Sequence, residues 1–139
     1  MKGKILIVED HEMIAETYKL ILESEGYEVT VTVDGDECIR KYDEQLQKNT
    51  ENRNAAPFEL VVVDYHLPGR DGIDVIGHIL SAAPYQRILI ASAYARDVIG
   101  RSAQSLDRSV ELMLKPFELD AFVDTIEGRR APEIIGGYV

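Results

Sequence analysis

Apolar runs alternate with amphipathic stretches along almost the whole of this 139-residue chain, and this alternation constrains the fold more than any single residue does. A short run of β-branched and aliphatic residues is typical of a strand that is buried on both faces. A stretch whose apolar residues recur every three or four positions is typical of a helix with one face in the core. The sequence predicts five strands, at residues 4–8, 28–33, 58–63, 87–91 and 110–114.

A helix is predicted in each gap between these strands and after the last one. Four of the five have a clear apolar stripe, such as Val75, Ile76 and Ile79 in the third. The fourth helix, within residues 96–106, is poorly patterned and rich in Ser, Ala and Gly. Strict alternation of strands and helices with short connections requires parallel strands joined by right-handed crossovers. The expected fold class is therefore three-layer α/β, with helices on both faces of an open parallel sheet.

The length and composition of the chain fit one globular domain. With 45% hydrophobic residues, a chain of this size can bury one substantial core. We expect the domain to cover residues 1–128, with a tail at 129–139 and a polar loop at 48–57. The tail is too short to form a DNA-binding module, so a free-standing domain and a domain cut from a longer protein both fit.

Three classes of protein are disfavoured by the composition. No run of about 18 apolar residues and no signal peptide is present, so we expect a cytoplasmic protein without a membrane span. The single cysteine, Cys38, has a helical pattern around it and is expected to pack in the core rather than to do redox chemistry. The formal charge of −10 disfavours direct binding to nucleic acid, which requires a basic surface.

The residues that end the predicted strands carry most of the chemistry of this chain. In an open parallel sheet, ligands bind beyond the carboxyl ends of the strands. The first, third, fourth and fifth strands lead there into three acids, a hydroxyl and a lysine, namely Glu9, Asp10, Asp64, Ser92 and Lys115. Each of these residues is ordinary alone, but their convergence at one edge of the sheet predicts a functional site.

Carboxylates placed this close together repel one another, by about 4 kcal/mol per pair at 4 Å and an effective dielectric constant of about 20. Lys115 supplies one positive charge, and a hard divalent cation with oxygen ligands would supply the rest, so we expect Mg²⁺, or Mn²⁺ in its place. Acids, metal, hydroxyl and lysine in one cleft favour phosphoryl transfer onto a carboxylate. Asp64 is the candidate nucleophile, because it ends a buried strand and an aspartate can form an acyl phosphate.

Four motifs of the chain resemble those of the CheY-like receiver domains of two-component response regulators. The resemblance covers residues 2–127, nearly the whole chain. It implies the flavodoxin-like and CheY-like (βα)5 fold with strand order 2-1-3-4-5, an order for which CheY is a standard example, and a cis Lys115–Pro116 peptide bond. The motifs are ILIVED (5–10), VVVDYHLPGRDG (61–72), ILIASAY (88–94) and LMLKPF (112–117).

The resemblance also implies a role for each residue of the site. Asp64 is expected to be the phosphoacceptor, while Ser92 and Lys115 sense the phosphoryl group. Asp10 is expected to bind the metal directly and Glu9 to bind it through water. The remaining metal ligands would be Asp64 itself and the backbone carbonyl of His66, and the side chains of His66 and Tyr94 are expected to set the lifetime of the phosphorylated state.

The chain departs from the family's pattern near the fifth strand. Leu112 stands where receivers usually carry an aromatic switch residue, and residues 108–109 are Arg-Ser instead of Gly-Ala. Leucine has no ring to swing, so we expect Leu112 to be passive packing. The switch would then be carried by residues 93–106, whose weak apolar stripe indicates low local stability.

The predicted function is that of a signalling phosphoacceptor and not of an enzyme with a separate substrate. Its phosphoryl donor would be a phosphohistidine on a sensor histidine kinase or a histidine phosphotransfer protein. The downstream protein partner, the signal and the oligomeric state are not encoded in any transferable motif.

Several other classes share part of the pattern. A pseudo-receiver would be a pure interaction module, and it would lack phosphorylation. An aspartyl phosphatase of the haloacid dehalogenase type needs a second acid where His66 stands, and an FMN protein needs a phosphate loop where the acidic run at 9–12 stands. His11 and His66 beside the acids would suit a transition metal, although Mg²⁺ fits the acids better.

Overall fold

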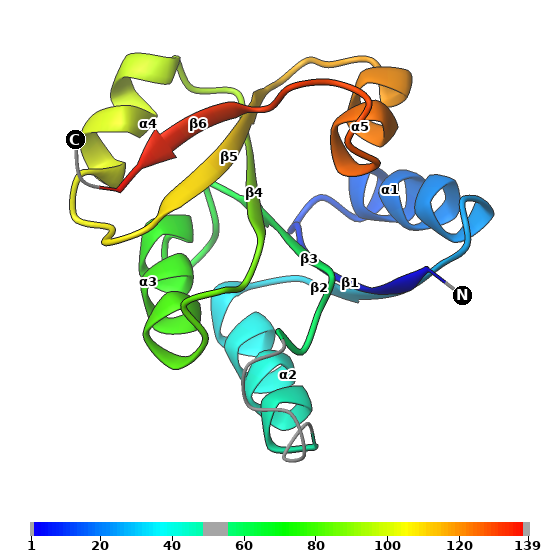
Figure 1. Cartoon of the computed structure of the whole chain (residues 1–139), viewed down its shortest axis with the longest axis horizontal. Coiled ribbons are helices and arrows are strands. Elements are labelled where there is room, and N and C mark those ends of the chain that lie inside the picture. Colours follow the sequence, from blue (N-terminus) through cyan, green and yellow to red (C-terminus); the bar gives the residue numbers. More distant parts are fainter. Residues whose placement is uncertain (1, 49–55, 138–139) are drawn as a thin grey trace.

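The computed structural model of the chain describes residues 2–48 and 56–137. Five helices and six strands alternate along these described residues. Figure 1 shows how they are arranged. Most of the polar loop predicted at 48–57 lies outside the described residues. The strands are β1 (Gly3–Val8), β2 (Tyr27–Thr32), β3 (Leu60–Asp64), β4 (Ile88–Ser92), β5 (Ser109–Leu114) and β6 (Glu133–Gly136), and the helices are α1 (Glu12–Ser24), α2 (Gly35–Lys48), α3 (Gly72–Ala82), α4 (Arg96–Ala103) and α5 (Leu119–Ile126).

The first five strands form a parallel sheet in the order β2-β1-β3-β4-β5, which confirms the predicted fold class. Their bounds differ from the predicted ones by at most two residues. Asp64 and Ser92 are the last residues of β3 and β4 in the structure, where the sequence placed them just after each strand. The Lys115–Pro116 peptide bond is cis, as the resemblance implied.

The sixth strand was not predicted. β6 lies within the expected tail and pairs antiparallel with β5 at the edge of the sheet. It is half buried, because Ile135 is 5% exposed while its neighbour Ile134 is 46% exposed. Gly136 ends it at φ +76°, where a Cβ atom would lie 3.1 Å from the carbonyl oxygen of Arg108. Glycine therefore suits this position both by its conformation and by its lack of a side chain.

The sheet is covered by helices on both faces (Figure 1). Alternate residues of the strands point to opposite sides, so that Leu6 and Val8 face one core and Ile5 and Ile7 face the other. Buried side chains of α2, α3 and α4 belong to the first core, and those of α1 and α5 to the second. The result is the predicted three-layer arrangement.

Cys38 and α4 illustrate how well the sequence pattern predicted burial. Cys38 is completely buried in the first core, and burial raises the pKa of its thiol to about 12, which makes it unreactive. α4 ends at Ala103, three residues before the predicted limit, and its buried residues are Ile99 and Ala103. Its weak apolar stripe is therefore a real property of the helix. No helix among residues 2–48 and 56–137 is long and apolar enough to span a membrane.

Candidate functional site

The carboxyl ends of the four central parallel strands meet at one pocket, as the topology requires. β1 leads into Glu9 and Asp10, β3 and β4 end at Asp64 and Ser92, and β5 leads into Lys115. All five predicted residues line this open pocket of about 380 Å³. The other residues that line it are His11, Ile14, His66, Ala93 and Tyr94.

Three acids stand close together in the pocket. One carboxylate oxygen from each of Glu9, Asp10 and Asp64 lies within 4.8 Å of the other two. Glu9 is 2% exposed, Asp10 is exposed and Asp64 is half buried. Lys115 places its Nζ atom 2.8 Å from Oε1 of Glu9 and 3.8 Å from Oδ2 of Asp64. One lysine thus faces three acids, and the pocket carries an excess of negative charge.

The protonation of Glu9 and Asp64 reflects this excess. Burial, together with the hydrogen bond and charge of Glu9, raises the pKa of Asp64 to about 7. Burial also opposes ionisation of Glu9, but its hydrogen bonds to Asp64 and Lys115 outweigh burial and hold its pKa below the usual value. The two acids therefore oppose each other's ionisation, and in the absence of a cation Asp64 is the harder of the two to ionise.

The backbone around Asp64 is held in place by hydrogen bonds. The amide of His66 donates to Oδ1 of Asp64 at 3.1 Å, and the amide of Tyr65 donates to the carbonyl of Ala91 on β4 at 3.2 Å. The chain then turns back, so that the amide of Gly72 donates to the carbonyl of Tyr65 at 3.1 Å. A Cβ atom on Gly72 would lie 2.8 Å from the carbonyl oxygen of Asp64, so the close turn requires glycine.

Ser92 and Tyr94 stand beside the acids on the β4 side. Ser92 is buried, and its Oγ accepts a hydrogen bond from the amide of Tyr94 at 3.0 Å. The ring of Tyr94 is 41% exposed at the mouth of the pocket, with its hydroxyl 3.4 Å from Nδ1 of His66. Tyr94 and His66 therefore both line the pocket that contains Asp64.

Two further residues, Leu112 and His78, lie apart from the acids, whereas His11 lies beside them. Leu112 is 1% exposed, packs in the first core and does not line the pocket. His78 is on α3, where its Nε2 lies 3.1 Å from a carboxylate oxygen of Asp43 on α2. His11 does line the pocket, and its amide donates to Glu9 at 3.4 Å.

Tyr65 was not among the predicted site residues. This half-buried residue follows Asp64 directly, and its hydroxyl lies 2.6 Å from Oγ of Ser102 on α4. An aromatic residue after the strand-ending acid was the only signal in the sequence, and it could not indicate a partner on a helix 37 residues away.

The three acids fit a hard divalent cation. Carboxylate and carbonyl oxygens are the ligands that Mg²⁺ and Mn²⁺ prefer, and the repulsion between the acids gives a cation a large favourable interaction. Asp10 and Asp64 offer exposed or half-buried carboxylates, and the carbonyl of His66 is in the same turn. Glu9 is deeper and already paired with Lys115, which suits the predicted indirect role.

Comparison with known proteins agrees with this arrangement. The response regulator receiver domain model matches residues 5–127. An uncharacterized transcriptional regulatory protein of Bacillus subtilis, YkoG, is 33% identical over 129 residues, which cover 90% of this chain and 50% of that protein. The chemotaxis protein CheY of Listeria monocytogenes is 25% identical over 130 residues, which cover 89% of this chain and 95% of that protein.

Solved structures agree as well. The response regulator TrrA from Thermotoga maritima, in complex with Mg²⁺ and BeF, has a TM-score of 0.71 at 27% identity and covers 92% of this chain and 98% of its own. A CheY-like receiver domain protein from Methanospirillum hungatei has a TM-score of 0.75 at 22% identity, covers 93% of this chain and 94% of its own, and supports the fold alone. The chain spans about half the length of the first curated relatives that it matches. The chain belongs to the response regulator receiver domain family of two-component systems.

Proposed function

We propose that this domain accepts a phosphoryl group on Asp64 from a phosphohistidine, in a reaction that depends on Mg²⁺ or Mn²⁺. The donor would be a sensor histidine kinase or a histidine phosphotransfer protein. The observation that carries the proposal is the pocket in which two other acids and one lysine surround the half-buried Asp64 at the carboxyl edge of the sheet. A related protein, TrrA of Thermotoga maritima, has been solved with Mg²⁺ and BeF, which supports the same chemistry here.

In the proposed step, a carboxylate oxygen of Asp64 attacks the phosphorus atom of the phosphohistidine. The new O–P bond forms as the N–P bond breaks, and the imidazole leaves with the bonding electron pair. A divalent cation, when bound, would neutralise negative charge on the transferred phosphoryl oxygens. Asp10, Asp64 and the carbonyl of His66 would hold it directly, and Glu9 would hold it through water.

Lys115 and Ser92 would contact the phosphoryl oxygens. The Nζ atom of Lys115 is already 3.8 Å from Asp64, so a small movement away from Glu9 would bring it to an oxygen of the phosphoryl group. Ser92 accepts a hydrogen bond from Tyr94 through its lone pair, which leaves its own hydrogen available for donation. Tyr94 and His66 stand at the mouth and would control the access of water to the acyl phosphate, and hence its lifetime.

The output of the domain would be a change in a surface that binds a protein partner. The net charge of −10 supports a protein partner over nucleic acid, and a cytoplasmic location would place the domain with its kinase.

Intact-protein mass spectrometry with acetyl phosphate and Mg²⁺ tests the proposal. The wild type is expected to gain one phosphoryl group, and Asp64→Asn none. Asp34→Asn is the matched control, because Asp34 accepts a hydrogen bond from the amide of Glu37 at the start of α2, and asparagine caps helices equally well. Phosphorylation of Asp64→Asn, or phosphorylation that a chelator does not reduce, would contradict the assignment. A wild type that gains nothing would make the chain an interaction module without phosphorylation.

A further inference from the structure

One hydrogen bond joins the proposed phosphoacceptor strand to α4. The hydroxyl of Tyr65 lies 2.6 Å from Oγ of Ser102. The Oγ atom of Ser102 also lies 3.3 Å from the carbonyl oxygen of Val98 in the preceding turn, and a serine that donates to this carbonyl can accept from Tyr65. The link spans from the residue next to Asp64 to the last turn of α4.

Tyr65 is also held by the loop that follows β4. Its ring meets that of Tyr94 edge-on, with the ring centroids 5.4 Å apart. The amide of Tyr94 bonds to Ser92, whose hydroxyl would contact the phosphoryl group. Tyr65 is therefore connected to Asp64 by the adjacent peptide bond, and to Ser92 through Tyr94.

The first turn of α4 is attached to β6. Arg96 forms an ion pair with Glu133, and its Nη2 atom lies 3.4 Å from the carbonyl oxygen of Ile134. α4 and β6 lie side by side at the β5 edge of the sheet (Figure 1). Further along, the amide of Gly137 donates to the carbonyl of Leu106, just beyond the helix, at 3.2 Å. One short helix is thus tied to the pocket by its last turn and to β6 by its first.

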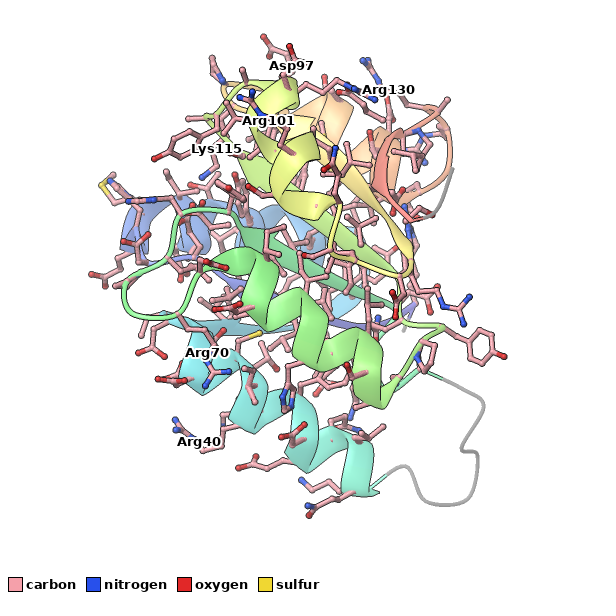
Figure 2. The ribbon with its side chains drawn as sticks, turned by 90° about the vertical axis from the view of Figure 1, so that its left-hand side faces the viewer. Arg40, Arg70, Asp97, Arg101, Lys115 and Arg130 are labelled. Atoms are coloured by element: carbon pink, nitrogen blue, oxygen red, sulfur yellow. The ribbon has the colours of Figure 1, made fainter. Side chains whose placement is uncertain are left out.

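α4 has little else to hold it in place. It is eight residues long, two of which are buried, and the residue before it, Ala95, offers no side-chain cap. Asp97 and Arg101 project outward from it (Figure 2). A short, uncapped helix with few buried residues has a low local free energy of unfolding, so single contacts at its ends have a large influence on its position.

We propose that α4 transmits the state of Asp64 to β6, with Tyr65 as the positioning residue on the pocket side and the Arg96–Glu133 ion pair on the β6 side. The inference rests on the proposed function, since phosphorylation is the change that would be transmitted. It makes β6 the output element of this domain. Leu112, which is buried and opposite Glu133 in the β5–β6 register, then serves as packing.

Amide hydrogen exchange with and without beryllofluoride and Mg²⁺ tests the route. In the wild type, the mimic is expected to change exchange in both α4 and β6, by about fivefold for amides that depend on one hydrogen bond. Tyr65→Phe removes one hydroxyl and should remove most of the response in both elements. Glu133→Gln should keep the response of α4 and lose that of β6.

Two variants serve as matched controls. Tyr27→Phe also removes a tyrosine hydroxyl that is hydrogen-bonded, to Glu127 at 2.8 Å, but on the far side of the sheet from α4. Asp36→Asn also breaks an exposed ion pair, with Arg70. Both should respond to the mimic as the wild type does. Fluorine NMR of the bound mimic measures occupancy of the site separately.

The outcomes separate the two proposals. A wild type that does not bind the mimic contradicts the proposed function. Binding of the mimic with a full response of α4 and β6 in Tyr65→Phe contradicts the transmission route and leaves the phosphoacceptor role intact. Binding with no response of β6 in the wild type likewise contradicts β6 as the output element.

Discussion

The charged side chains at the two ends of the sheet differ in how well they are paired. At the carboxyl ends of the strands, three acids face a single lysine, and the pKa of Asp64 is raised to about 7. At the amino ends of β4 and β5, Arg87 and Glu111 form a two-pronged ion pair, with N–O distances of 2.7 and 3.0 Å. Arg87 also donates to the carbonyls of Thr125 and Ile126 at the end of α5.

The difference separates charges that stabilise the fold from charges at the proposed phosphoacceptor site. The four described hydrogen bonds that Arg87 donates are all 3.0 Å or shorter. Its hydrogen bonds to Glu111 raise the pKa of the guanidinium, so the charged form of Arg87 stabilises the folded state. In the pocket, ionisation of Asp64 opposes folding until a cation arrives. Functional sites commonly store unfavourable interactions of this kind, and the rest of the fold must compensate for them.

The largest effect on stability is expected at the amino end. Arg87→Met keeps much of the side-chain length but leaves Glu111, which is 8% exposed, without its partner, and removes the hydrogen bonds that Arg87 donates to the carbonyls of Thr125 and Ile126 at the end of α5. Breaking a largely buried pair in this way should lower the free energy of unfolding by about 3 kcal/mol. Urea unfolding provides the measurement.

The matched control is Arg70→Met. Arg70 pairs with Asp36 at 3.2 Å on the surface, where the two side chains are 44% and 73% exposed. Figure 2 shows Arg70 on this outer face of the molecule. An exposed pair contributes about 0–1 kcal/mol, so equal losses for the two arginine variants would contradict the structural role of Arg87.

A smaller effect of opposite sign is expected in the pocket. In protein freed of divalent cations, Asp64→Asn should raise the free energy of unfolding by about 1–2 kcal/mol, because it removes one of the repelling carboxylates. The pH dependence gives a sharper test. An acid with a raised folded-state pKa stabilises the protein below its unfolded pKa, and this stabilisation is lost as the pH rises through the folded pKa, here about 7.

The advantage of Asp64→Asn should therefore grow from about pH 4, where Asp64 ionises in the unfolded chain, and level off above about pH 7, where it is ionised in the folded protein as well. Unfolding curves at several pH values, with a chelator present, provide the measurement. A difference between the two proteins that stays constant over this range would show that Asp64 is already ionised at low pH and is not opposed by Glu9.

The sequence predicted those parts of the fold that depend on periodicity. Runs such as 61–63 and 88–91 are apolar at every position, and a short run of this kind is typical of a strand that is buried on both faces of the sheet. β6 was missed because it has two apolar residues between a charged residue and a glycine, and because its pairing depends on the exposed edge of β5. A strand this short has no period to detect.

The candidate site likewise has features that the sequence could predict and features that it could not. The meeting of Glu9, Asp10, Asp64, Ser92 and Lys115 follows from parallel strands, whose carboxyl ends share one edge, so the sequence could predict it. The preference of Lys115 for Glu9 over Asp64 depends on side-chain conformations and could not be predicted. The bond between Tyr65 and Ser102 requires the position of α4 relative to β3, which only packing determines.

The central claim is that the carboxyl end of the sheet carries uncompensated charge that a divalent cation neutralises. The most direct test measures the effect of Mg²⁺ on the free energy of unfolding of the wild type, Arg87→Met and Asp10→Ala. At a Mg²⁺ concentration about five times the dissociation constant of the wild type, Mg²⁺ should stabilise both the wild type and Arg87→Met by about 1 kcal/mol. Arg87→Met should respond normally because Arg87 lies at the amino end of the sheet, away from the pocket. Asp10→Ala should gain almost nothing, since it lacks a direct ligand. An equal gain in Asp10→Ala, or no gain in the wild type, would contradict the claim.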